Sequence, residues 1–307
     1  MPGGGRLPVA AVVVNYNAGA ALASCVENLT AEGVAEVLVV DNGSADGSVA
    51  LLRQSETGFR LIEPGRNLGY GGAANLGARA TSEPYLLICN PDLTARPGAL
   101  AALVKRLDED DSIGLVGPML RDRTGEVYPS GREFPGLAGA IGHAFVGLFW
   151  GGNPWTRRYR HLGSDQHASR EADWVSGAFM VARKLAYDSV GGFDEGYFMY
   201  VEDVDLCWRL HRAGWTVWYE PAAAVDHEQG VSTSRHPYRM LLAHHSSMWR
   251  FAARTAQGWE RALLPLMAVG LAARLLLSWA DHLLRPVRDE LLARANVGSH
   301  ARGEFQP

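Results

Sequence analysis

The stretch Tyr85-Leu86-Leu87-Ile88-Cys89-Asn90-Pro91-Asp92 joins an apolar run to a polar turn. A short, continuous apolar run that ends at turn residues is typical of a strand buried on both faces, as in a parallel sheet. Open sheets of this kind bind ligands beyond the carboxyl ends of their strands. We therefore expect a buried strand over 85–89, with Asn90 and Asp92 at the edge of the sheet where a ligand binds.

Similar apolar runs occur on both sides of this stretch. The β-branched runs Val9–Val14 and Val37–Val40 are suited to buried parallel strands, and helix-like segments separate the runs. Further strands are expected over 59–62, 114–116, 174–183 and 216–219, and helices over 18–29, 48–53, 71–79, 97–107 and 203–213. Alternation of strands and helices predicts an α/β fold with a Rossmann-like, doubly wound mixed sheet.

The composition is that of an ordinary globular protein. The chain has 307 residues, 47% of them hydrophobic and 20% charged, so it can bury a full core and is not a disordered protein. A net charge of −4 gives no basic face for duplex nucleic acid, and we expect no nucleic-acid partner. The three cysteines lie in apolar stretches and are expected to be buried thiols in a reducing cytosol. The N-terminus runs straight into a strand, which predicts no signal peptide.

Two regions depart from the strand–helix pattern. Residues 119–172 are rich in Gly, Pro, Arg and aromatic residues, which suggests an insertion that lines an acceptor groove, a mobile lid or a plain surface loop. Residues 262–280 are nearly all apolar and approach the length of a membrane span, but Arg274 lies near their middle. An interfacial helix on a membrane fits this pattern better than a span, and a helix packed on the domain or on another subunit is the alternative.

Carboxylates follow several of the expected strands. Asp41 comes directly after an apolar strand and could accept the N3–H of a uracil or thymine ring, while Asp46 or Ser48 is expected to cap the next helix. Asp92 is a natural ligand for a hard divalent cation that bridges two phosphates, and Asn90 could add only a neutral oxygen. The alternative for Asn90 and Asp92 is a simple turn at a strand end.

The sequence also offers a candidate base and a second metal ligand. Glu202 and Asp203 open a helix, where acids are common as caps; one of them aimed into a cleft could deprotonate an acceptor hydroxyl. Which of the two is structural is not decided by spacing. His227 follows the last expected strand and is either a packing residue or a metal ligand.

A glycine-rich turn leads into the helix expected at 71–79. Its residues Asn67, Gly69 and Asn75 could let the backbone approach a ligand, and the start of the helix favours anions. Turns of this composition often serve only packing. The segment lacks the Lys-Ser/Thr ending of a P-loop.

Together these motifs resemble the inverting family 2 glycosyltransferases of the GT-A fold, over roughly residues 8–235. The resemblance rests on Val13-Val14-Asn15-Tyr16-Asn17, Val40-Asp41-Asn42-Gly43-Ser44, Asn67-Leu68-Gly69-Tyr70, Asn90-Pro91-Asp92, Trp174-Val175-Ser176-Gly177-Ala178 and Gly191-Gly192-Phe193-Asp194-Glu195 through Glu202-Asp203-Val204-Asp205-Leu206.

The resemblance implies a role for each motif. Asp41 would contact the nucleotide base, Asp92 and His227 would bind Mg²⁺ or Mn²⁺, and Asp203 would be the catalytic base. The donor site would further include Asn15, Asn17, Asn67, Gly69, Asn75, Asn90, Trp174, Ser176, Gly177 and Glu202. Asn90 departs from the Asp that is usual at its position in the family.

A narrower resemblance is to rhamnosyltransferases that transfer from dTDP-L-rhamnose to N-acetylglucosaminyl-diphospho-polyprenol in cell-wall linker synthesis. It rests on Gly117-Pro118, Val127-Tyr128-Pro129-Ser130, Asn153-Pro154-Trp155-Thr156 and Tyr197-Phe198-Met199-Tyr200. It implies a catalytic domain over 1–235 and a helical region over 236–307 that associates with a membrane or with another copy, on the cytoplasmic face of the cell membrane. The alternatives are another donor, such as a UDP-hexose, with a polysaccharide or lipid-linked acceptor, and a noncatalytic protein that binds sugar nucleotides or glycans.

Overall fold

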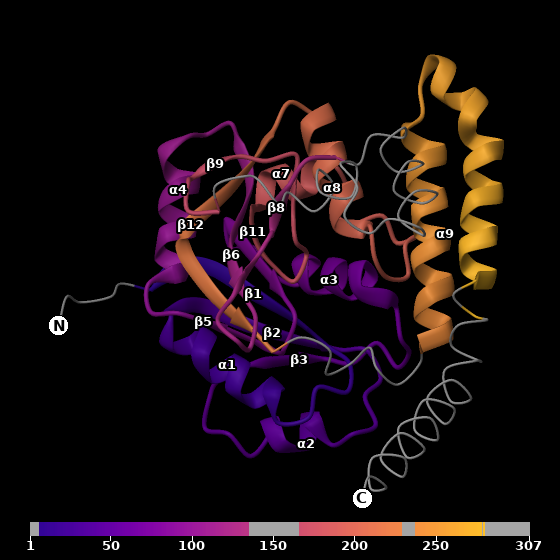
Figure 1. The fold of residues 1–307 in the computed structure, drawn as a ribbon. Helices are drawn as coiled ribbons and strands as arrows, with labels where there is room; N and C mark the ends of the chain where they lie inside the picture. The colour runs from indigo at the N-terminus through magenta and orange to yellow at the C-terminus, as the bar shows by residue number, and fades with distance from the viewer. Residues whose placement is uncertain (1–5, 135–165, 229–236, 278, 280–307) are drawn as a thin grey trace, which may run out of the picture.

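A computed structural model describes residues 6–134, 166–228, 237–277 and 279. Part of the insertion expected over 119–172, the motif at 153–156 and most of the chain beyond 277 therefore lie outside the described residues. The described part of the chain forms an α/β domain with a helical pair beside it (Figure 1).

One large mixed sheet forms the centre of the protein. Its strands are β1 (Leu7–Asn15), β2 (Val34–Asp41), β3 (Arg60–Ile62), β4 (Tyr85–Cys89), β5 (Leu93–Ala95), β6 (Ile113–Arg121), β11 (Phe179–Arg183) and β12 (Thr216–His227), in the order β3-β2-β1-β4-β11-β6-β12-β5. The strands β7 (Val127–Tyr128) and β9 (Arg170–Glu171) pair with β6 and β12, and β8 (Gly131–Arg132) and β10 (Trp174–Val175) form a separate pair. The expected strand over 85–89 and the mixed, doubly wound sheet are confirmed.

The direction of the strands puts one set of ends on a common edge. The strands β3, β2, β1 and β4 are parallel, β11 runs antiparallel to β4 and β6, and β12 is parallel to β6. The ends of β1, β2, β4 and β12 therefore lie at the same edge as the start of β11.

Two expected strands differ in extent from the observed ones. The strand expected over 174–183 is divided into β10 and β11, because residues 176–178 turn the chain from its pairing with β8 to its pairing with β4. The strand expected over 216–219 continues to His227, since a register shift between Glu220 and Ala224 lets β12 resume its pairing with β6.

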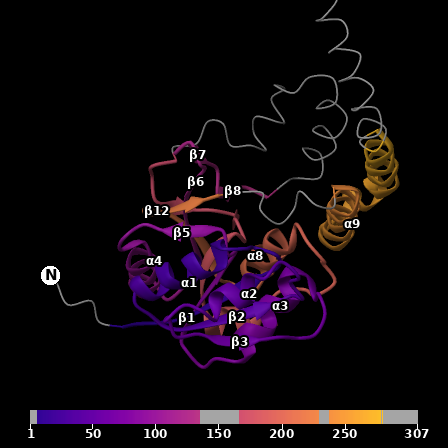
Figure 2. The ribbon, with the colours of Figure 1, turned by 90° about the horizontal axis from the view of Figure 1, so that it is seen from below.

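Helices cover both faces of the sheet. Alternate residues of β1 enter two separate cores, as the two-residue period of a strand requires. One core contains α1 (Ala21–Ala31), α2 (Ser48–Leu52) and α4 (Ala99–Glu109), and the other contains α3 (Gly69–Arg79), α7 (Lys184–Ser189) and α8 (Glu202–Arg212). Figure 2 shows these layers from below. The three cysteines are buried and free, as expected.

The C-terminal part forms two helices side by side, which we call the helical hairpin, residues 237–277. It comprises α9 (Pro237–Thr255), the 3-10 helix η1 (Gly258–Leu263) and a helix over 264–277 (Figure 1). Ala252 of α9 packs against Met267 and Leu271, so one face of the last helix is covered. None of the helices within the described ranges combines the length and the hydropathy of a transmembrane span.

Candidate functional site

The ends of β1 and β2 place Asn15 and Asp41 side by side. Their backbones pair in register, and Asn15 Nδ2 donates to Asp41 Oδ1 at 2.7 Å. The Ser44 hydroxyl donates to Asp41 Oδ1 at 2.5 Å, and the Ser44 N–H donates to Oδ2 at 3.1 Å. These donors orient the buried Asp41 carboxylate and leave acceptor capacity on Oδ2.

The loops after these strands brace each other. Asn17 adopts a left-handed conformation (φ 53°), and its side-chain oxygen accepts from Ala45 N at 2.8 Å. Asp46 accepts from Gly19 N and from Ser48 N. The cap position of α2 is held by Gly47, which has no side chain to accept a hydrogen bond, so the expectation that Asp46 or Ser48 caps this helix is wrong. Through its backbone conformation and its bond to Ala45 N, Asn17 thus helps to fix the shape of the loops at this edge of the sheet.

The glycine-rich turn connects the site to the segment before α8. Gly69 has φ +76°, and a Cβ there would lie 2.4 Å from the carbonyl oxygen of Phe198, so only glycine fits. Asn67 accepts from Gly69 N at 2.8 Å. The Asn42 side chain donates to Gly69 O at 3.0 Å and accepts from Leu68 N at 3.1 Å. The absence of a side chain at Gly69 therefore makes room for the carbonyl group of Phe198, a part of the protein itself, rather than for a ligand.

Asn75 uses its whole amide within the protein. Its nitrogen donates to Phe193 O and to Glu195, and its oxygen accepts from Phe193 N and from the Tyr187 hydroxyl. Gly192, whose Cβ would lie 2.4 Å from the Asn75 oxygen, belongs to the same loop. This geometry favours a structural role for Asn75, which fastens the loop that precedes the acid pair.

Asp92 and His227 meet at the end of β4 and β12. His227 pairs with Leu93 in the sheet, and its Nε2 lies 3.4 Å from Asp92 Oδ1. Asp92 Oδ1 is buried and has no hydrogen-bond partner among the described residues. The other ring nitrogen of His227 lies 2.6 Å from the Tyr128 hydroxyl, which can fix the orientation and tautomer of the ring.

This pair fits a divalent cation that is shared with a substrate. The described residues include no group of three or more His, Cys, Asp or Glu that could hold a metal ion by themselves. Mg²⁺ and Mn²⁺ are commonly bound by one or two protein ligands together with substrate phosphates. Asp92 and His227 fit that arrangement, because Asp92 Oδ1 has no hydrogen-bond partner among the described residues and could bind a cation.

The acid pair begins α8 after a strained segment. Tyr200 and Val201 have φ of 68° and 69°, which is costly for residues with a Cβ and especially for a β-branched one. This backbone turns Glu202 and Asp203 toward the sheet edge. Asp203 Oδ2 accepts from Gly177 N at 2.8 Å, and Oδ1 accepts from Val204 N at 2.9 Å.

The two acids differ in their surroundings. Burial, together with the nearby charge of Asp203, raises the pKa of Glu202 from its ordinary value to about 8. Glu202 is 7% exposed, and its Oε2 finds no hydrogen-bond partner in the described part of the chain. Burial also raises the pKa of Asp203, but the N–H groups of Gly177 and Val204 and the charge of Arg132 oppose that rise. Asp203 is therefore the better stabilised anion of the pair.

A cavity of about 550 Å³ opens beside the acid pair. The structure brings six of the predicted site residues to its wall: Asn90, Trp174, Ser176, Gly177, Glu202 and Asp203. Asn90 N donates to Ala178 O at 2.9 Å, which joins the end of β4 to the turn before β11. Asp41, Asp92 and His227 are not in its wall, although they lie at the same edge of the sheet. The site thus has two neighbouring parts.

Sequence reasoning did not identify Arg132 as a site residue. Arg132 lies in the wall of the cavity, its guanidinium 5.0 Å from the ring centre of Trp174, and its Nε donates to Pro129 O. It belongs to the segment expected to line an acceptor groove, but only the pairing of β8 with β10 shows which arginine reaches the site. His244 and Phe251 of α9 also line the cavity.

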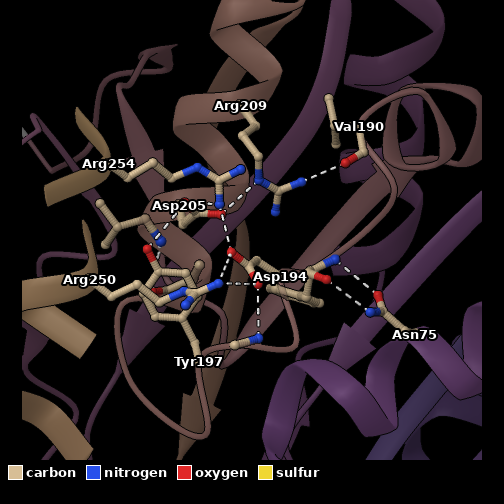
Figure 3. A network of polar contacts seen from close by, with 12 residues as sticks. Asn75, Val190, Asp194, Tyr197, Asp205, Arg209, Arg250 and Arg254 are labelled. Carbon is tan, nitrogen blue, oxygen red and sulfur yellow. Dashed lines mark hydrogen bonds and ion pairs between the residues drawn. The ribbon is translucent and has the colours of Figure 1, made fainter. Parts of the chain in front are cut away.

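A charged network fastens α9 beside the acid pair (Figure 3). Arg250 and Arg254 both form ion pairs with Asp194, at 3.0 and 2.6 Å. Arg254 also reaches the fully buried Asp205 of α8 at 3.2 Å, and Arg209 lies 2.7 Å from the same carboxylate. The network ties the hairpin to the loop and helix that carry the acids.

Comparison with known proteins agrees with this architecture. The profile of Glycosyl transferase family 2 matches residues 10–187. N-acetylglucosaminyl-diphospho-decaprenol L-rhamnosyltransferase of Mycobacterium tuberculosis is 41% identical over 271 residues, 84% of this chain and 87% of that protein. Rhamnosyltransferase WbbL of Escherichia coli is 26% identical over 79% of this chain and 92% of its own length.

Solved structures show the same fold at low sequence identity. The mannosyltransferase PcManGT from Pyrobaculum calidifontis, in complex with GDP-Man and Mn²⁺, superposes with a TM-score of 0.56 at 18% identity, over 95% of this chain and 80% of its own. GalNAc-T7 with UDP, GalNAc and Mn²⁺ gives a TM-score of 0.54 at 15% identity, over 72% and 43%. The fold is the expected GT-A fold, and with a profile that spans more than half of its length the chain belongs to glycosyl transferase family 2.

Proposed function

We propose that this protein transfers L-rhamnose from dTDP-L-rhamnose to N-acetylglucosaminyl-diphospho-polyprenol with inversion at the anomeric carbon. The observation that carries the proposal is the 41% identity to the mycobacterial rhamnosyltransferase. A match over 84% of the chain necessarily includes the acid pair and α9, so it covers the acceptor side of the site as well as the donor domain.

Asp203 is the proposed catalytic base. Its carboxylate lies in the wall of the cavity and is fixed by two backbone N–H groups, so it can accept a proton without a change of position. Glu202 beside it retains its own proton at neutral pH, because its pKa is about 8, and so adds no second charge to oppose that of Asp203. A single displacement then converts a β-linked donor into an α-L-rhamnoside.

Asp92 and His227 are the proposed ligands of Mg²⁺ or Mn²⁺. When bound, the cation would neutralise charge on the departing dTDP. The orphaned Asp92 oxygen and the ring of His227, oriented by Tyr128, support this assignment. The Mn²⁺ in the two solved GT-A neighbours supports use of a divalent cation in this fold.

The proposed nucleotide site lies at the ends of β1 and β2. Asp41 keeps a free lone pair on Oδ2 for the N3–H of thymine, and Asn15, Asn17 and Asn67 shape the surrounding loops. Trp174, Ser176, Gly177 and Asn90 line the cavity together with the acid pair, and we assign to them the donor sugar at the point where it meets the acceptor.

The hairpin is the proposed contact with the membrane. It exposes large apolar side chains, among them Trp249, Trp259, Leu266, Val269 and Leu276, which suit an interfacial position. Residues 237–277 contain the five arginines 239, 250, 254, 261 and 274 against the single acid Glu260, in a chain of net charge −4. Arg250 and Arg254 are paired with Asp194, so the excess positive charge of the hairpin rests on the other arginines. Such a balance favours the anionic cytoplasmic leaflet. Association with a second copy through the same face is the alternative.

A donor panel tests the proposal. The purified protein is incubated with a short-chain N-acetylglucosaminyl-diphospho-lipid, Mg²⁺ or Mn²⁺, and dTDP-L-rhamnose, UDP-glucose, UDP-galactose or GDP-mannose. We expect release of dTDP, with a mass gain of one deoxyhexose on the acceptor, from the first donor alone. Turnover with a UDP-hexose instead would replace the donor assignment, and donor binding without any turnover would favour a noncatalytic binding protein.

A further inference from the structure

The cavity beside Asp203 has two chemically different walls. One wall is polar and contains Asn90, Arg132 and the acid pair. An apolar wall is formed by Met199 and the hairpin residues Met248, Phe251, Ala252, Ala256 and Met267; the hairpin also adds His244, Thr255 and Glu260 to the lining. A ligand that fills the whole cavity must therefore have a polar part that meets the acids and an apolar part that meets the hairpin.

The nucleotide of the donor does not account for the apolar wall. Asp41, Asp92 and His227 lie outside the lining of the cavity, so the nucleoside diphosphate belongs to the other part of the site. A volume of about 550 Å³ lies within the roughly 300–1,000 Å³ typical of sites for molecules larger than one sugar. Space thus remains on the acceptor side after a hexose is placed against Asp203.

The six apolar residues of this wall bring no charge that would oppose a hydrocarbon. Phe251, Ala252 and Met267 are each less than 8% exposed, so their surfaces in the cavity are shielded from bulk water. Burial, with the neighbouring His245 and Arg274, lowers the pKa of His244 to about 4, and this residue of the wall is neutral at physiological pH. Glu260, an acid that the hairpin adds to the lining, lies in η1 rather than on α9, and its carboxylate accepts from Gln257 N.

The wall is also held in a fixed place. Ser247 Oγ donates to Met199 O at 3.0 Å, and the ring of His244 meets that of Tyr200 edge-on at 5.5 Å. The ion pairs of Arg250 and Arg254 with Asp194 hold α9 against the same loop (Figure 3). Since the apolar wall and the acid pair are joined by this loop, an apolar group seated on the hairpin would have a defined position relative to Asp203.

We propose that the space between residues 199–201 and the hairpin is a binding site for the first isoprene units of the lipid acceptor. The inference rests on the proposed function, because it assigns the tail of the same acceptor whose sugar faces Asp203. The tail then binds the enzyme directly, beyond any role in keeping the acceptor in a membrane. Each isoprene unit that enters the site should strengthen binding, since its apolar surface is removed from water.

Calorimetric titration with three water-soluble acceptors tests the site without requiring turnover. The probes are the methyl, prenyl and geranyl esters of N-acetylglucosaminyl diphosphate, used below their aggregation limits in the absence of detergent. We expect affinity to rise at least about tenfold with each isoprene unit. Equal affinity for all three would overturn the proposal. Tail-dependent binding without rhamnosyl transfer would support the lipid site while refuting the proposed function.

Two variants and a matched control locate the effect. Ala252→Leu fills the apolar part of the cavity, and Met248→Gln makes its wall polar at similar size. Both variants should reduce the increase in affinity from the methyl to the geranyl ester about tenfold. The affinity for the methyl ester itself should stay unchanged. Ala253→Leu, on the exposed side of α9, should retain the wild-type gain. Melting curves show whether either cavity variant is misfolded. If one of them is, the other cavity variant tests the position of the tail. A full tail effect in both cavity variants would place the tail elsewhere and overturn the assignment.

Discussion

Replacement of Glu202 by glutamine tests the electrostatics of the acid pair. The folded protein raises the pKa of this side chain from 4.5 to about 8, first through burial and then through the charge of Asp203. Below pH 4.5 the carboxyl is protonated in both the folded and the unfolded state. Between 4.5 and about 8 the unfolded chain releases the proton while the folded protein keeps it, so the folded state loses stability as the pH rises.

The size of the effect follows from the shift. Each pH unit in this window costs the wild-type protein about 1.4 kcal/mol relative to Glu202→Gln, whose amide does not titrate. The variant should therefore be more stable by about 3 kcal/mol at pH 7 and by about 5 kcal/mol above pH 8, with no difference near pH 4.5. Because Glu202 is only 7% exposed, little of this is lost to solvent screening.

Urea unfolding at a series of pH values measures the difference. The free energies of unfolding of wild type and Glu202→Gln should diverge steadily from about pH 5 to 8 and then run parallel. Glu56→Gln, a change on an exposed side chain, is the matched control and should track the wild type at every pH. A difference that does not vary with pH in this window would show that Glu202 is already ionised and would refute the reasoning.

Other expected outcomes concern the remaining parts of the site. Asp203→Asn should lower kcat by about 100-fold or more while the Kd for the donor, measured by calorimetry, stays unchanged; retention of turnover would exclude Asp203 as base. Asp92→Ala should abolish both activity and the response to added Mn²⁺ in a metal titration, and a variant that keeps both would move the metal elsewhere. Arg254→Met should lower the free energy of unfolding by about 1–2 kcal/mol in urea titrations, because Asp205 is fully buried but keeps its pairing with Arg209; no loss would show that the network of Figure 3 contributes little.

The fold was largely predictable because its signals are local. The runs Val9–Val14, Val37–Val40 and Tyr85–Cys89 within β1, β2 and β4 are apolar without interruption, which is typical of strands buried on both faces, and the polar residues after them mark the ligand edge. The positions of Asp41, Asn90 and Asp92 at this edge were predicted in this way. The division into β10 and β11 was not, since an apolar run does not reveal a change of pairing partner.

The sequence by itself determined the α/β class, the family and the identity of the acids at the strand ends. Only the tertiary structure decided which of Glu202 and Asp203 is the stabilised anion, because burial, the N–H group of Gly177 and the charge of Arg132 come from segments distant in sequence. It also decided that Asn75 braces a loop and that α9 completes the cavity. These roles depend on contacts between segments that are distant in sequence. The periodicity of apolar residues along the chain indicates helices and strands, but it does not show which residues a given side chain contacts.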